Sequence, residues 1–131
     1  MDAGERVALS SGQEASLQRS LSTAREISGV CFGLRIGSLP EGRDSAVAAH
    51  AQLPDAARAV LVAVDPAARV IEIVTGTGVV DHLDDRSCEL AIISMRSGFL
   101  AGDLVRGMKD GIDLLAQHAR MPKVMNLDEP A

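Results

Sequence analysis

The most constraining feature of this chain is an unbroken apolar run, Ala-Val-Leu-Val-Ala-Val, at residues 59–64. A strand with one face in water alternates apolar and polar residues, so a strand without polar positions is normally covered on both faces. Asp65 and Pro66 follow at once, and Pro66 suits the second position of a type I turn. Because residues 70–74 resume the apolar pattern after a short connection, the two segments are predicted to pair as an antiparallel hairpin.

A helix and a strand are predicted near the start of the chain. Residues 11–14, Ser-Gly-Gln-Glu, fit a capping box in which Ser11 caps the helix and Glu14 reaches back to the cap amide. Apolar residues at helical spacing follow, and Gly29 suits the helix end. Residues 30–36 then alternate between apolar and other positions, which is typical of a strand.

Three more helices complete the predicted elements. Asp44 is placed to cap a short Ala-rich helix that Pro54 ends, because the residue before a proline avoids the helical region. Apolar residues at 90–93 predict a helix ended by Gly98, and residues 104–115 show the spacing of another. Two residues in this last helix lie one turn apart and allow close helix packing, Gly107 and Gly111.

The order of elements is helix, strand, helix, hairpin, helix, helix. This order predicts an α/β fold with a small three- or four-stranded mixed sheet, a central β-hairpin and helices on both faces. We expect one domain over residues 11–120. Residues 1–10 are predicted to form a flexible arm, and residues 121–131 a mobile tail without periodicity.

Charge and aromatic content exclude some classes of partner. The chain of 131 residues has a net charge of −5, and 2% of its residues are aromatic. Binding of nucleic acid needs clustered basic residues or aromatic rings for stacking, so no nucleic-acid partner is expected. The sequence shows neither a secretory signal nor an apolar segment that approaches the ~20 residues of a membrane span, so the expected compartment is the cytoplasm. The oligomeric state stays open.

The densest cluster of polar and flexible residues is the loop at residues 75–85, between a strand end and a helix start. In layered α/β folds, ligands gather in loops at strand ends. Glycines permit close backbone approach, carboxylates supply oxygen ligands to Mg²⁺ or Ca²⁺, and histidine can act as an acid or base. The candidate ligand-binding residues are Gly76, Gly78, Asp81, His82, Asp84 and Asp85, of which the three aspartates are the candidate metal ligands.

A structural interpretation of the 75–85 loop is favoured over this binding hypothesis. Glycines after a strand often only make the turn, and Asp84 and Asp85 sit where a helix cap and a first-turn acid are expected. The loop lacks both the Gly-Lys-Ser/Thr of a P-loop and the third glycine of a dinucleotide fingerprint. Under this interpretation the chain needs no cofactor.

A few polar residues outside this loop carry weaker signals. Arg35 lies within the predicted strand at 30–36, where a charged residue is usually paired or at a sheet edge, and it is a further candidate for ligand contact. His50 is interpreted as a surface or boundary residue and His118 as a complement to a helix dipole. The two cysteines, Cys31 and Cys88, are expected to be free thiols that pack as small apolar groups, with a disulfide and a reactive thiol as the alternatives.

Residues 59–115 resemble the TPM-domain family, including its small actinobacterial relatives known as domains of unknown function. The resemblance is carried by the order and spacing of several short segments. These are the strand AVLVAVDP, the hairpin partner RVIEI at 69–73, TGTGV at 75–79, Asp85 at a helix start, FLAGD at 99–103, and residues 107–115.

The resemblance implies the layered fold derived above and several possible functions. Members of the family are linked to assembly or repair of membrane complexes, to the cell envelope, and in some cases to phosphatase activity or divalent-metal binding. Family members often carry an acidic residue shortly after the Gly-x-Gly pair, where this chain has Val80. We therefore expect a non-enzymatic accessory or interaction domain with an unknown protein partner. The alternatives are a metal-dependent phosphatase or hydrolase that uses the 75–85 loop, and a small-ligand-binding regulator.

Overall fold

The apolar run forms the middle strand of a three-stranded sheet in the computed structural model, which describes residues 9–119. This strand, β2 (Ala59–Asp65), is buried along its whole length. It pairs in parallel with β1 (Cys31–Ile36) and antiparallel with β3 (Val70–Thr75). In the register of the hairpin, Val62 lies opposite Ile73. The predicted mixed sheet and its central hairpin are therefore confirmed.

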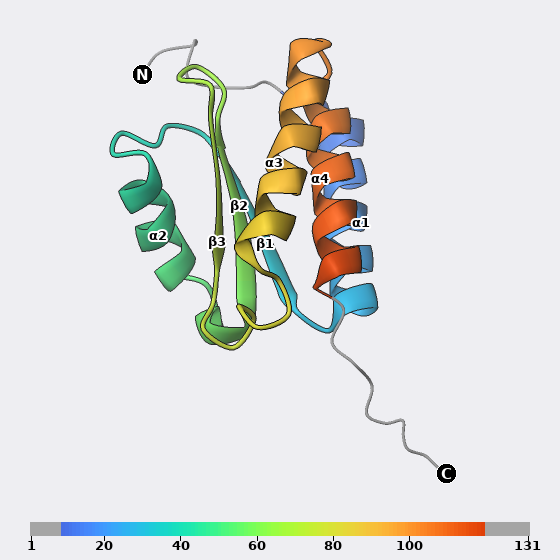
Figure 1. Ribbon diagram of the computed structural model, residues 1–131. Helices are drawn as coiled ribbons and strands as arrows, with labels where there is room; N and C mark the ends of the chain where they lie inside the picture. Colours follow the sequence, from blue (N-terminus) through green and yellow to red (C-terminus); the bar gives the residue numbers. More distant parts are fainter. Residues whose placement is uncertain (1–8, 120–131) are drawn as a thin grey trace.

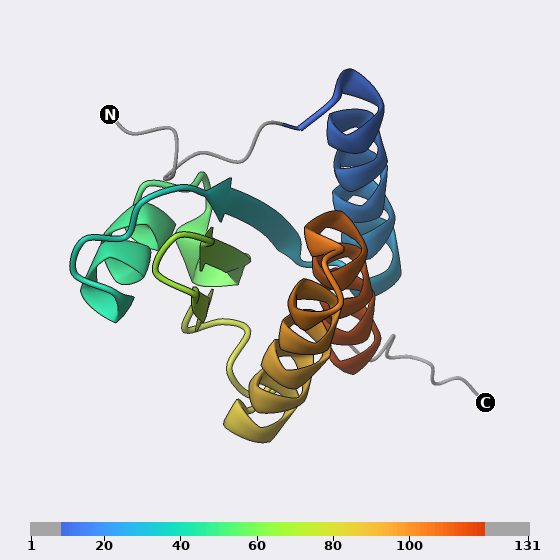
Figure 2. The ribbon, with the colours of Figure 1, turned by 90° about the horizontal axis from the view of Figure 1, so that it is seen from above.

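Helices cover both faces of the sheet, as predicted (Figures 1 and 2). Helix α2 (Arg43–Ala51) lies on one face, and a short 3₁₀ helix, η2 (Ala56–Arg58), leads from it into β2. The other face is covered by α1 (Ser11–Ser28), α3 (Asp85–Leu100) and α4 (Leu104–His118).

The two faces of β2 supply two separate hydrophobic cores. Val60, Val62 and Val64 point into the main core under α1, α3 and α4. Leu61 and Ala63 point the other way, into a smaller core under α2. Because both faces are covered, every position of the strand must be apolar, which is the physical reason for the unbroken run.

Two of the predicted helix starts are wrong by one or two residues. Ser10, not Ser11, caps α1, and the capping box closes with Gln13 in place of Glu14. The Gln13 amide donates to the Ser10 hydroxyl oxygen over 3.0 Å, and the Ser10 amide donates to Gln13 Oε1 over 2.9 Å. Gly42, with φ of 57°, precedes α2 and makes no side-chain cap, while Asp44 lies within the first helical turn.

Glycines bring α3 and α4 into close contact, as predicted for Gly107 and Gly111. A Cβ at Gly107 would lie 2.8 Å from the carbonyl oxygen of Met95, and one at Gly111 would overlap the Met95 side chain. Gly98 does not end α3, which continues to Leu100. A Cβ at Gly98 would instead meet the backbone of Gly107, so this glycine serves the same helix contact.

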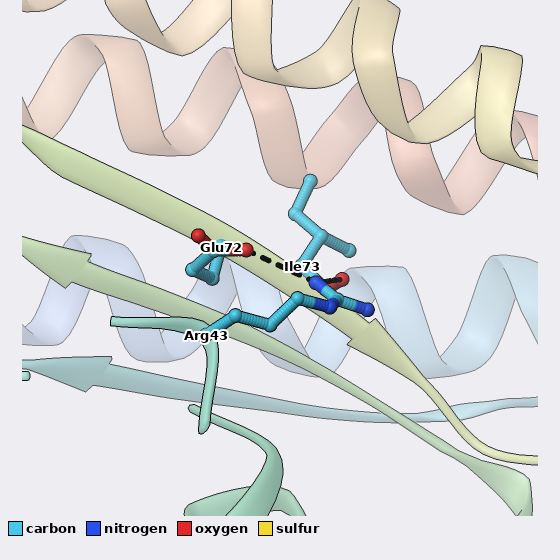
Figure 3. A network of polar contacts seen from close by, with 3 residues as sticks. All are labelled: Arg43, Glu72 and Ile73. Carbon is cyan, nitrogen blue, oxygen red and sulfur yellow. Dashed lines mark hydrogen bonds and ion pairs between the residues drawn. The ribbon is translucent and has the colours of Figure 1, made fainter. Parts of the chain in front are cut away.

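Polar contacts fix α2 to the sheet. Arg43 Nη1 lies 3.0 Å from Glu72 Oε1 and donates to the Ile73 carbonyl oxygen over 3.2 Å (Figure 3). At the other end of α2, His50 is buried, which corrects its interpretation as a surface or boundary residue. His50 Nε2 donates to the Ala59 carbonyl oxygen over 3.0 Å and so links the helix end to the start of β2.

The predicted arm and tail lie largely outside the described residues. Of residues 1–10, the structure describes Leu9 and Ser10, and Ser10 belongs to α1 as its cap. The predicted tail at 121–131 lies wholly outside the described part. Among the helices within residues 9–119, none combines the length and hydropathy that a bilayer crossing requires.

Candidate functional site

The two ends of the sheet present different groups to solvent. Because β1 and β2 are parallel, their carboxyl ends lie at the same end of the sheet, beside the hairpin turn at 66–69. We call this end of the sheet the hairpin-turn edge. β3 runs the opposite way, so the 75–85 loop that follows it lies at the other edge, at the bottom of Figure 1. In open α/β sheets, ligands bind outside the carboxyl ends of the parallel strands. This rule favours the hairpin-turn edge over the 75–85 loop.

The glycines of the 75–85 loop pack against the chain itself. The Gly76 amide donates to the Ala59 carbonyl oxygen over 2.9 Å, and the Gly78 amide donates to the Ala57 carbonyl oxygen over 2.7 Å. A Cβ at Gly76 would overlap the carbonyl oxygens of Ala56 and Ala57. The lack of a side chain at these glycines therefore lets the loop lie against η2. Two apolar residues of the loop complete the main core, Val79 and Leu83.

Asp84 caps α3. Its Oδ1 accepts a hydrogen bond from the Ser87 amide over 2.9 Å, and Asp85 follows as the acid of the first helical turn. Hydrogen bonds from the Ser87 backbone and side chain lower the pKa of Asp84, and His118 adds a smaller favourable charge. Both residues thus occupy the positions that the structural interpretation gave them.

Asp81 and His82 lie in the same loop without such a role. Asp81 is exposed and His82 is half-buried. Among residues 9–119, no group of three or more His, Cys, Asp or Glu side chains is arranged to hold a metal ion. Whether the loop binds a ligand stays a prediction.

Replacing Asp84 with Ala is expected to lower the melting temperature more than replacing Asp81 or Asp85 does, because Asp84 alone caps the helix. The pKa of Asp84 lies below its ordinary value of 3.8 in the folded protein. Its contribution to stability is therefore present above that value and lost as the pH falls through the lower folded-state pKa. Thermal melts of the three variants at pH 7 and pH 3 measure this, and equal melting temperatures at pH 7 would contradict it.

The structure brings together a serine and a histidine that the sequence keeps apart. Ser87 Oγ lies 3.0 Å from His118 Nδ1, so the start of α3 is joined to the end of α4. A hydroxyl beside an imidazole has the form of a nucleophile and its base. Here the carboxylate of Asp84 binds the Ser87 backbone and not the imidazole, and Ser87 is buried. Asp84, Ser87 and His118 therefore connect α3 to α4, and they lack the carboxylate–imidazole bond of a catalytic triad.

The two cysteines are free thiols, as predicted. Cys88 is half-buried on α3, whereas Cys31 is exposed, so the expectation that both thiols pack as apolar groups is wrong for Cys31. Burial raises the pKa of Cys88 from 9.0 to about 11, and the charges of Asp85 and Asp84 add to the shift. A thiol is a nucleophile only as thiolate, so Cys88 is not prepared for chemistry.

We expect native protein at pH 8 to be alkylated at Cys31 long before Cys88. The raised pKa of Cys88 leaves about 100-fold less thiolate at that pH than an ordinary cysteine has. Mass spectrometry after a timed iodoacetamide pulse measures both sites. Alkylation of Cys31 and Cys88 at the same rate in the native protein would contradict the burial of Cys88.

Arg35 lies on an outer strand and is separated from the 75–85 loop. It pairs in register with Ala63, near the carboxyl end of β1, and so lies on the face that carries α2. Its side chain is exposed. A position on an outer strand is the usual placement of a charged strand residue. The structure does not bring Arg35 together with the candidate residues of the 75–85 loop.

A cavity of about 530 Å³ lies at the hairpin-turn edge, lined by residues of that turn and of the connection from α3 to α4. These two segments lie at the top of Figure 1. Its lining combines charged and apolar side chains, among them Asp65, Arg69, Ile71, Arg96, Phe99 and Leu100. The sequence does not indicate this cavity, because its lining comes from β2, β3, α3 and α4, which only the fold brings together. The one feature of the sequence that could have indicated it is Arg69 in a tight turn, where a residue with positive φ is often needed.

Comparisons with known proteins agree with the fold described above. The model of a family described as a domain of unknown function (DUF5130) matches residues 2–116. No curated protein matches the chain.

Two solved structures share the fold at low sequence identity. The BA42 protein of the psychrophilic bacterium Bizionia argentinensis is 18% identical, with a TM-score of 0.74 over 87% of this chain and 83% of that one. The N-terminal domain of a protein from P. gingivalis is 21% identical, with a TM-score of 0.62 over 84% of this chain and 75% of that one. Likeness at this identity shows the fold alone.

Proposed function

This chain belongs to the DUF5130 family of domains of unknown function, and from that premise we propose that it is a non-enzymatic accessory domain that acts by binding a partner. The observation that carries the proposal is the use of the 75–85 loop. Its glycines hold the loop against η2 and its Asp84 caps α3, so its most distinctive groups stabilise the fold. A binding role then falls to other surfaces of the domain.

The TPM resemblance is part of this proposal. It rests on the order of short segments from residue 59 to residue 115 and adds a setting, the maintenance of the cell envelope or of a membrane complex. Val80 stands where TPM-domain proteins often carry an acidic residue, and this supports the accessory role over a metal-dependent one.

The competing proposal is a metal-dependent phosphatase or hydrolase that uses Mg²⁺ or Ca²⁺ in the 75–85 loop. Three side chains of the loop make no side-chain hydrogen bond within residues 9–119 and could take part in such chemistry: the exposed carboxylates of Asp81 and Asp85 and the imidazole of His82. Asp84 would have to exchange its bond to the Ser87 amide for a metal, which would uncap α3. The proposed accessory role requires no such exchange.

Hydrolysis of p-nitrophenyl phosphate with added Mg²⁺, Mn²⁺ or Ca²⁺ tests the two proposals. We expect no turnover above the rate of the metal ion in buffer. Asp81→Asn is the informative variant, and Asp44→Asn, which changes an exposed acid in the first turn of α2, is its matched control. Turnover that is lost in Asp81→Asn and kept in Asp44→Asn would overturn the accessory role.

A further inference from the structure

The cavity at the hairpin-turn edge carries a net positive charge on a negatively charged protein. Two of its lining residues are basic, Arg69 and Arg96, and one is acidic, Asp65. The chain as a whole has a net charge of −5. Within residues 9–119 the arginines that form ion pairs are Arg43 and Arg106, so both guanidinium groups at the cavity keep their hydrogen-bond capacity.

Asp65 also lines the cavity, and its carboxylate makes no ion pair with either arginine. The residue is buried, its Oδ2 accepts from the Leu39 amide over 2.9 Å, and its Oδ1 accepts from the Ala68 amide over 3.1 Å. Both carboxylate oxygens are therefore held by backbone amides. These bonds hold the turn that carries Arg69, a residue of the cavity lining.

Arg69 adopts a backbone conformation that costs energy. Its φ is 60°, in the left-handed region that favours glycine. Strained backbone that persists is concentrated at functional sites, where it positions a side chain. A glycine would adopt this positive φ with less strain, yet the position holds an arginine that lines the cavity.

The rest of the lining is apolar. Ile71 and Phe99 extend the lining from the sheet and from α3, and Leu100 stands at the rim with 78% of its surface exposed. This exposure is the largest among the big apolar side chains within residues 9–119. An apolar group that entered the cavity would cover such surface, which favours binding.

We infer that this cavity binds a small amphiphilic anion, whose carboxylate or phosphate group is held by Arg69 and Arg96 and whose apolar body lies against Phe99 and Leu100. The planar fork of a guanidinium group matches both oxoanions. The position at the carboxyl ends of β1 and β2 is the one that open α/β sheets use for ligands. This inference rests on the proposed function and names the chemistry of the ligand.

Titration with octanoate, followed by amide chemical shifts, tests the inference on the whole chain. We expect shifts around the hairpin turn and the end of α3, and weaker binding of octanol and of acetate, since each lacks one half of the ligand. Octyl phosphate in a parallel titration distinguishes the two oxoanions. Vesicles of phosphatidylglycerol distinguish a free anion from a lipid surface, and binding to vesicles alone would overturn the inference.

Three variants assign the binding to this cavity. Arg96→Met is expected to weaken octanoate binding about tenfold, the usual effect of losing a hydrogen bond to a charged group. Arg86→Met, an exposed arginine on the same helix, is the matched control and is expected to bind as the wild type does. Arg69→Gly is expected to weaken binding while the melting temperature stays equal or rises, because the positive φ is relieved.

Absence of octanoate binding, or binding that Arg96→Met and Arg69→Gly leave unchanged, would overturn the inference and leave the accessory role standing. Hydrolysis of the phosphate ester at the 75–85 loop would instead overturn the accessory role. Because the two sites lie at opposite edges of the sheet, the two failures are distinguishable.

Discussion

Replacing Val62 with Asp is expected to unfold the protein. Val62 is fully buried in the middle strand, with its side chain in the main core and its backbone between two neighbouring strands. An unpaired charge at such a site costs several kcal/mol, which approaches the whole stability of ~5–15 kcal/mol of a typical domain. Far-UV circular dichroism and a thermal melt should show no cooperative transition.

Val47→Asp is the matched control for this change. Val47 lies on α2 and is 44% exposed, so a charge at that position stays in water. We expect this variant to melt cooperatively, close to the wild type. A cooperative melt of Val62→Asp at a similar temperature would contradict the assignment of β2 as the covered middle strand.

Replacing Gly76 with Ala is expected to give the second-largest loss. The added Cβ would overlap two backbone carbonyl oxygens of η2, which cannot rotate away as a flexible side chain can. The backbone must shift, and the bond from the Gly76 amide to Ala59 is strained with it. Overpacking of this kind costs about 1–3 kcal/mol, and more where backbone must move. The melting temperature should fall by roughly 5–15 °C.

Gly12→Ala serves as the control for Gly76→Ala. Gly12 lies in the first turn of α1, where a Cβ would have Ser10 Oγ as its nearest neighbour at 3.9 Å. Alanine is the better helix former, so this variant should be as stable as the wild type or slightly more stable. If the two variants had the same melting temperature, the 75–85 loop would be loosely packed and open to a role in binding.

The fold was predictable because its strongest signals are local. The apolar run at 59–64 requires cover on both faces, and the Asp65-Pro66 turn requires an antiparallel neighbour. Helix starts were less predictable because adjacent residues compete for the cap. Ser10 and Ser11 are both suitable, and only the geometry of the first turn selects Ser10. Gly42 precedes α2 through its backbone conformation, which no side-chain pattern reveals.

The candidate site was less predictable because it depends on contacts between distant residues. Asp84 as a helix cap follows from local spacing and is confirmed. The bond from Ser87 to His118 joins residues 31 positions apart, and no periodicity indicates it. The cavity likewise needs Arg69 from the hairpin and Arg96 from α3. The predicted antiparallel hairpin already places the 75–85 loop at the amino end of β2. That the carboxyl ends of two parallel strands meet at the opposite end depends on the pairing of β1 with β2, which the sequence pattern left open.

We propose that the 75–85 loop supports the fold and holds no metal ion. The melting temperature with and without millimolar Ca²⁺ or Mg²⁺ tests this claim most directly, because a ligand raises stability only when it binds the native state. We predict that the melting temperature of the wild type stays the same within error. A rise of several degrees that is lost in Asp81→Ala would contradict the claim and favour the metal-dependent hydrolase.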